Sequence, residues 1–140
     1  MNAIVPRLFQ VRLPGPEDGP DFREIQTLQT EAADIPETAG LRAGVMYGLL
    51  CLPAPEVERL AHLAGELAAH VAERVLSDTL LLVTDYHRGL ATLSVIAPGG
   101  RVQTELPPDS LAHIEPTDRT GVIQHDMGPS AYVQVQAVQP

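Results

Sequence analysis

One long stretch, PEVERLAHLAGELAAHVAERVL from Pro55 to Leu76, limits the possible folds of this chain most. Its apolar residues recur at the spacing of one helix face, and its charged residues take the opposite face. Pro55 suits a first helical position, because its missing N–H would be unpaired there in any case. A helix of about 22 residues is about 33 Å long. It therefore needs a large partner surface, which strands before and after it could supply.

Size and composition are those of an ordinary globular domain. The 140 residues and 15.0 kDa fit a single domain spanning residues 1–140. No apolar run approaches the roughly 20 residues that span a bilayer, and the start of the chain lacks the pattern of a secretory signal. We therefore expect a soluble, cytoplasmic protein without a membrane partner.

The charge balance argues against nucleic acid as a partner. The formal net charge is −9, lysine is absent, and the nine basic residues are scattered arginines. Binding to phosphates depends on clustered Lys and Arg, so we expect no nucleic-acid partner. The acidic balance leaves open an inhibitor or DNA-mimicking protein that binds a basic partner.

The first 40 residues predict a strand and a helix. Residues 4–13 alternate well enough for a strand with one buried face, and residues 14–20 are rich in turn formers. In residues 22–35 the apolar side chains fall on one helical face, after an Asp21–Glu24 spacing typical of a capping box. We expect a modest helix there, ended by Pro36.

The segment LRAGVMYGLLCL, residues 41–52, is compatible with a buried strand or a buried helix. We favour a strand, because Gly44 and Gly48 would each cost about 1 kcal/mol in a helix interior relative to alanine. In either form the glycines would let the small residues of the long helix approach closely. Cys51, the only cysteine, lies between two leucines, so we expect it to be buried and structural.

After Asp78 the pattern changes to period two, which predicts antiparallel strands. The expected strands are residues 79–86, 89–97, 101–106, 121–126 and 131–138. The predicted fold class is α+β: an antiparallel sheet of about five to seven strands packed on one long central amphipathic helix, with a second shorter helix. The last strand carries uncharged Gln134 and Gln136. We expect it to form a sheet edge that favours dimerisation.

This order of elements resembles two known fold types in part. A hot-dog fold wraps a sheet round one long helix, and a roadblock-type module places a long helix before a three-strand meander. The resemblance is in element order and carries no motif, so it implies no functional residue of this chain.

A metal site is one hypothesis for the polar face of the long helix. His62, Glu66 and His70 stand at i, i+4 and i+8, and two histidines with a carboxylate could contribute ligands to a divalent ion. Two full turns span about 12 Å, which is too far for one ion to take all three. Weak pairs on a solvated helix face explain the same spacing. We therefore expect no metal and no cofactor.

The densest chemistry along the chain is the segment Asp85-Tyr86-His87-Arg88-Gly89. A histidine beside a carboxylate is a general-base candidate, which makes Asp85, His87 and Arg88 weak catalytic candidates. The same segment is typical of a hairpin turn, which we favour.

His125 and Asp126 form a second pair of weak catalytic candidates. If the strands 79–86 and 121–126 ended on the same side of the sheet, His87 and His125 could share a pocket. Without a recognisable catalytic motif, we expect a non-catalytic interaction or regulatory protein. It would be a homodimer acting through a sheet edge or a helix face. The alternatives are a hot-dog-like enzyme acting on an acyl thioester and an acidic inhibitor or DNA mimic.

Overall fold

The computed structural model describes residues 22–30 and 34–138. The strands in this part of the chain are β1 (Phe22–Gln29), β2 (Val75–Leu76), β3 (Thr79–His87), β4 (Leu90–Ile96), β5 (Arg101–Val102), β6 (Arg119–His125) and β7 (Gly128–Gln136). The helices are α1 (Ile35–Leu49) and α2 (Ala54–Arg74). The predicted α+β class, with a long helix packed on an antiparallel sheet and a second shorter helix, is confirmed.

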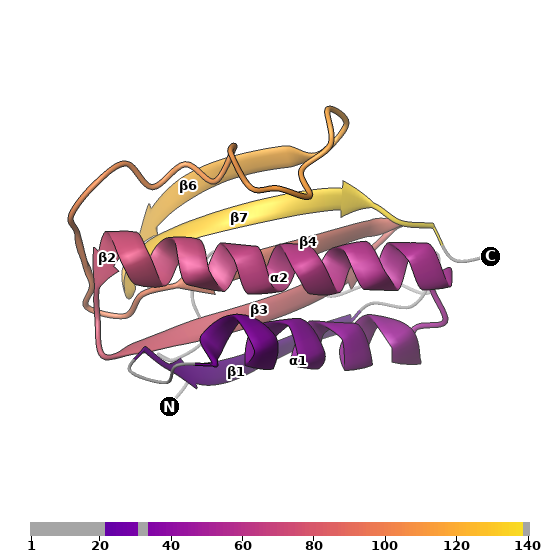
Figure 1. Ribbon diagram of the computed structural model, residues 1–140, viewed down its shortest axis with the longest axis horizontal. Helices are drawn as coiled ribbons and strands as arrows, with labels where there is room; N and C mark the ends of the chain where they lie inside the picture. The colour runs from indigo at the N-terminus through magenta and orange to yellow at the C-terminus, as the bar shows by residue number, and fades with distance from the viewer. Residues whose placement is uncertain (1–21, 31–33, 139–140) are drawn as a thin grey trace.

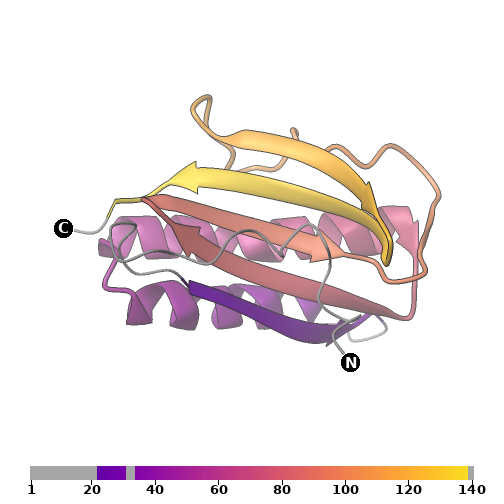
Figure 2. The ribbon, with the colours of Figure 1, turned by 180° about the vertical axis from the view of Figure 1, so that it is seen from behind.

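Five strands form one antiparallel sheet in the order β1-β3-β4-β7-β6, and β2 pairs with β5 in a separate two-stranded ribbon. Both helices lie side by side on one face of the five-stranded sheet (Figure 1). The view from behind shows the opposite face, with β1 at one edge of the described sheet and β6 at the other (Figure 2). Neither helix in residues 22–30 and 34–138 has the length and apolar character needed to cross a membrane.

The long helix is α2, as predicted, and its apolar stripe forms the centre of the core. The stripe faces the inner side chains of β3, β4 and β7, which supply the sheet half of the same cluster. The buried residues of α2 are Leu60, Leu63, Ala64, Gly65, Leu67, Ala68, His70 and Val71. Burial of the leucine, alanine and valine side chains among them provides the main driving force for docking the helix on the sheet.

A smaller apolar cluster lies on the face of the sheet away from the helices. Val83 and Ile96 are fully buried there, and Ile25, Leu81 and Met127 pack against them. Val83 and Ile96 alternate along their strands with Leu82 and Val95, which belong to the helix-side core. The central strands are therefore apolar on both faces, which is why the sequence of β3 is a nearly continuous apolar run.

The helix predicted for residues 22–35 is wrong, because Phe22–Gln29 is strand β1. It pairs with β3 along its whole length, from Phe22 opposite Tyr86 to Gln29 opposite Thr79. Phe22 and Leu28 contact the helix-side core, whereas Ile25 joins the cluster on the opposite face. Apolar residues three positions apart lie on one face of a helix, but on opposite faces of a strand. The spacing is therefore equally compatible with a helix and with a strand that is apolar on both faces.

The strand favoured for residues 41–52 is also wrong, and helix α1 takes its place. Pro36, expected to end a helix, instead lies in the first turn of this one. A Cβ built on Gly44 would lie 3.6 Å from the Cβ of Ala61, and one built on Gly40 would lie 3.0 Å from the Ala61 carbonyl oxygen. The two glycines thus allow α1 and α2 to pack closely. This tertiary contact outweighs the low helix propensity of glycine.

The strands after α2 follow the predicted pattern with three exceptions. Val75 and Leu76, predicted as the end of the long helix, form β2. The strand expected over 101–106 has only the two residues of β5. The final strand, β7, lies between β4 and β6 rather than at an edge, so its Gln side chains do not mark a free sheet edge. The strand expected over 4–13 and the turn segment 14–20 lie outside the described residues.

Candidate functional site

Helix α1 carries an exposed apolar surface on the side turned away from α2 and the sheet. Leu41, Val45 and Leu49 are 70%, 54% and 70% exposed, respectively. They stand four residues apart and so follow one another along one helix face. We call these three residues the α1 stripe. An aligned apolar row of this kind on a surface typically marks a binding site for another molecule.

Helix α1 is apolar around most of its circumference. Its sequence, IPETAGLRAGVMYGL, contains two charged residues, Glu37 and Arg42. Ala39, Ala43, Met46 and Tyr47 are buried on the inner side, so both sides of the helix are apolar. Surface helices normally carry charged residues on their outer face, and a helix that is apolar all round is normally buried. The α1 stripe therefore has the composition of a surface that is covered in an assembly.

Tyr47 holds α1 in place over the sheet. Its hydroxyl donates to the carbonyl oxygen of Asp85 at 3.0 Å, and the backbone N–H of Asp85 lies 3.3 Å from the same hydroxyl. Burial raises the pKa of the Tyr47 phenol well above its usual value, so the group stays protonated as a donor. This anchor fixes which side of α1 faces outward.

Arg42, beside the α1 stripe, reaches the edge of the sheet. Its Nη1 donates a hydrogen bond to the carbonyl oxygen of Thr27 on β1, at 2.9 Å. Thr27 belongs to the strand at one edge of the described sheet. Arg42 thus occupies an outward carbonyl that could otherwise accept a hydrogen bond from an added strand.

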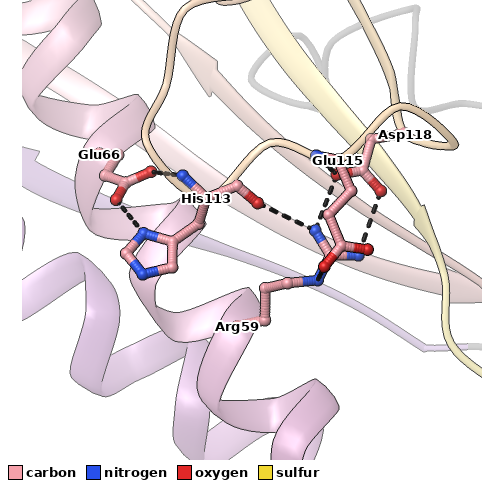
Figure 3. A network of polar contacts seen from close by, with 5 residues as sticks. All are labelled: Arg59, Glu66, His113, Glu115 and Asp118. Atoms are coloured by element: carbon pink, nitrogen blue, oxygen red, sulfur yellow. Dashed lines mark hydrogen bonds and ion pairs between the residues drawn. The ribbon is translucent and has the colours of Figure 1, made fainter.

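A second region of interest is a polar network between α2 and the segment before β6 (Figure 3). Arg59 Nη1 and Nη2 donate to the two carboxylate oxygens of Asp118, at 2.7 and 3.1 Å. The Asp118 side chain is 1% exposed and also accepts the backbone N–H of Glu115 at 2.8 Å. Its hydrogen bond raises the pKa of Arg59. The buried carboxylate is thereby fully paired, as a buried charge must be.

Two of the proposed metal ligands, His62 and Glu66, also contact this segment. The Glu66 carboxylate accepts the backbone N–H of His113 at 3.1 Å and pairs with His113 Nδ1. The rings of His62 and His113 stack with centroids 4.4 Å apart. Stacked rings direct their nitrogens sideways rather than toward a shared point. Among the described residues, no group of three His, Cys, Asp or Glu is arranged to hold a metal ion.

His70, the third proposed ligand, contacts a different part of the chain. It is 6% exposed, and its Nε2 lies 2.7 Å from the carbonyl oxygen of Leu106. Burial is the main cause that lowers the pKa of His70, with a smaller lowering by Arg74. The hydrogen bond to Leu106 acts in the opposite direction. The polar face of α2 was expected to be solvated, but these contacts show that residues 106–118 cover part of it.

The segment Asp85–Gly89 is a hairpin, as favoured from the sequence. Arg88 and Gly89 have φ values of 52° and 77° and form the two-residue turn between β3 and β4, where His87 pairs with Leu90. Positive φ at both central residues is the type I′ turn that matches strand twist. Asp85 forms an ion pair with Arg23 on β1, with Nε and Oδ2 3.3 Å apart. Asp85 and His87 alternate with Tyr86, so they share the sheet face away from the helices.

The pocket considered for His87 and His125 does not exist in this fold. β7 runs in the same direction as β3, and β6 is antiparallel to β7, so β3 and β6 end at opposite ends of the sheet. His87 ends β3 beside the β3–β4 turn, and His125 ends β6 beside the β6–β7 turn that begins with Asp126. The topology separates the two candidate pairs by the length of the sheet.

Cys51 was expected to be buried but is exposed. It follows the end of α1 with a φ of 60°, and its backbone N–H donates to the Gly48 carbonyl oxygen at 3.0 Å. A residue with positive φ at this place is a common way to end a helix. The turn directs Cys51 outward, whereas Leu52 next to it is 6% exposed and belongs to the core.

Neither the α1 stripe nor the pairing of Arg59 with Asp118 was predicted from the sequence. The α1 stripe was inside a segment read as a buried strand, and its four-residue spacing was the available signal. The partners Arg59 and Asp118 are 59 residues apart in the chain, and no local pattern links them. Comparison with known protein families and with curated proteins found no matching family model and no similar protein.

Proposed function

We propose that this chain is a non-catalytic interaction or regulatory protein of the cytoplasm that works as a homodimer through the α1 stripe. The observation that carries the proposal is the exposed row of Leu41, Val45 and Leu49 on a helix with only two charged residues, Glu37 and Arg42. Covering this row with protein removes apolar area from water, which is the main driving force of association.

A helix face supports this role better than a sheet edge. The Gln-bearing strand β7 is internal, and Arg42 already binds the outward Thr27 carbonyl of β1. The α1 stripe, in contrast, carries apolar side chains and leaves the backbone hydrogen bonds of α1 within the helix. A partner would therefore bind the α1 stripe through side-chain packing rather than by adding a strand to the sheet.

The alternative functions gain no comparable support. Of the two residues expected near the chemistry of an acyl-thioester enzyme, Asp85 is paired with Arg23, and His87 is the last residue of β3, directly before a tight turn. An inhibitor or DNA mimic would present carboxylates, whereas the most distinctive surface of α1 is uncharged. We therefore propose the interaction role alone.

The test is sedimentation of the full chain over a concentration range from about 5 to about 500 µM, which brackets the affinities of small interfaces. We expect reversible dimerisation of the wild-type protein and its loss in Val45→Glu. The matched control is Val102→Glu, because Val102 is also exposed, at 45% against 54% for Val45, and lies on β5. A monomer across the whole range, or equal loss of association in both variants, would overturn the proposal.

A further inference from the structure

We infer that the two copies meet through antiparallel α1 helices related by a two-fold axis that passes beside Val45. This inference rests on the proposed function and adds which residues of the second copy each stripe residue contacts. Leu41 packs on the partner subunit's Leu49, Val45 on the partner subunit's Val45, and Leu49 on the partner subunit's Leu41.

The spacing of the α1 stripe favours a second copy of this chain as the occupant. Leu41 and Leu49 lie four residues before and four residues after Val45, and both are 70% exposed. The row therefore has the same pattern of side chains in both chain directions. A two-fold interface needs a patch that is complementary to itself, and a row that is symmetric about its centre meets that condition when two helices run antiparallel.

The charges at the ends of α1 select the antiparallel over the parallel arrangement. Each chain carries a net charge of −9, so association requires a contact surface without facing carboxylates. Parallel helices would place the two copies of Glu37, in the first turn, close together. An antiparallel pair centred on Val45 separates them by about 24 Å, because each lies eight residues of 1.5 Å rise from the centre. The antiparallel pair also places opposite ends of the helix dipoles together.

Gly48 supplies room for the partner's leucine. It is exposed, and a Cβ built on it would meet no atom within 4 Å. In the antiparallel register the partner subunit's Leu41 lies over Val45, Gly48 and Leu49, which surround it as a hole surrounds a knob. The missing side chain at Gly48 makes that hole deep enough for a leucine. Within a single chain, no neighbouring atom at Gly48 requires a residue without a side chain.

The size of the surface predicts a weak, reversible dimer. From Leu41 to Leu49 the stripe is about 12 Å long, so one helix pair covers less than the roughly 800 Å² per partner of a standard interface. Interfaces at this end of the range are transient. The association should therefore be visible only at micromolar concentration or above.

The experiment mixes two charge variants of the full chain, Leu41→Glu and Leu49→Lys. Both positions are exposed, so circular dichroism should show unchanged folding. Each variant alone disrupts both ends of the antiparallel interface and should be monomeric. Their equimolar mixture restores one Leu–Leu contact and creates one Glu–Lys pair. We expect it to associate at least about tenfold more tightly than either variant alone.

Gly48→Leu is a second variant that acts by size rather than by charge. Its added side chain has open space in the separate chain, so folding should be retained, but it fills the hole and should prevent dimerisation. A wild-type dimer whose variant mixture is no tighter than either variant alone, or one that Gly48→Leu leaves intact, would overturn the antiparallel register while leaving the interaction role in place. A wild-type monomer at every concentration would instead overturn the proposed function itself.

Discussion

Asp118 and Glu115 contact the same guanidinium group with opposite exposure to solvent. The Asp118 side chain is 1% exposed and pairs with Arg59 through both oxygens, whereas Glu115 is 57% exposed, with its Oε2 3.6 Å from Arg59 Nε. The energetic weight of an ion pair depends on such burial. Removal of one partner of a buried pair leaves an uncompensated charge, but exposed pairs contribute little.

We therefore predict that Asp118→Asn lowers the free energy of unfolding by about 2–4 kcal/mol. The control Glu115→Gln, which removes the exposed contact to the same arginine, should change it by less than about 1 kcal/mol. Urea denaturation of the two variants and the wild type measures both effects. Equal losses in the two variants would contradict the importance of burial at this pair.

His70 gives the molecule a pH-dependent contribution to stability. Burial lowers its pKa in the folded chain below the value of 6.5 that applies in the unfolded chain. As the pH falls below about 6.5, His70 becomes protonated in the unfolded chain but stays neutral in the folded chain. The free energy of unfolding therefore falls with pH, until the pH also passes the lower pKa of His70 in the folded chain. Each unit of pKa difference corresponds to about 1.4 kcal/mol.

We predict that His70→Gln removes this part of the pH dependence. Glutamine keeps an N–H donor for the Leu106 carbonyl but cannot be protonated. Between pH 7.5 and pH 5, the wild-type protein should lose more free energy of unfolding than the variant. Denaturation curves of both proteins across that range provide the measurement, and parallel pH profiles would show that His70 is not the group responsible.

At the scale of the elements, the contact between α1 and α2 depends on small residues. A Cβ built on Gly65 of α2 would lie 2.7 Å from the carbonyl oxygen of Pro36, a backbone atom that cannot move without shifting α1. Gly48, in contrast, faces open space. Substitution of each glycine by alanine therefore distinguishes the effect of helix packing on stability from the effect of helix propensity.

We predict that Gly65→Ala destabilises the chain by about 1–3 kcal/mol through overpacking, even though alanine is the better helix former. Gly48→Ala should instead stabilise it by up to about 1 kcal/mol. Thermal unfolding at low concentration, where the chain is monomeric, is the appropriate measurement. A stabilising Gly65→Ala would mean that the helices are farther apart than the structure shows.

The elements also show which parts of the fold could be predicted from the sequence. The apolar stripe of α2 was sufficient to predict that helix. The strands β3, β4, β6 and β7 were predicted because turn-forming residues divide this part of the sequence into segments of strand length, even where, as in β3, both faces are apolar. β1 and α1 were misassigned because both are apolar on two sides, so their local pattern fits either structure. Their identity depends on pairing with β3 and on the close contact of Gly44 with Ala61, which are tertiary interactions.

The candidate site was out of reach for a related reason. A helix with apolar residues on both its inner and its outer side does not show in its sequence which of the two will face solvent. That side is fixed by Tyr47, whose hydroxyl binds the backbone of β3, and by the glycines that face α2. Only the folded arrangement shows that Leu41, Val45 and Leu49 remain outside.

At the scale of the whole molecule, the net charge of −9 opposes the meeting of two copies. Salt screens this repulsion, with a Debye length that falls to about 10 Å at 0.1 M ionic strength. We therefore predict that raising the salt concentration from about 20 to about 300 mM strengthens dimerisation, because an apolar contact loses nothing by screening. Sedimentation at the two salt concentrations tests this. Weaker association in high salt would indicate contacts between opposite charges instead.

The hydrogen bond from Arg42 to the Thr27 carbonyl bears on how large an assembly can become. Strand addition at a sheet edge can continue, since every added copy offers a new edge, and it leads to filaments. In a two-fold helix pair, each α1 stripe is covered by the other, so no α1 stripe remains exposed to bind a third copy. By binding one outward carbonyl of β1 beside the α1 stripe, Arg42 disfavours strand addition at this edge and so favours, on this side of the molecule, an assembly that stops at two chains.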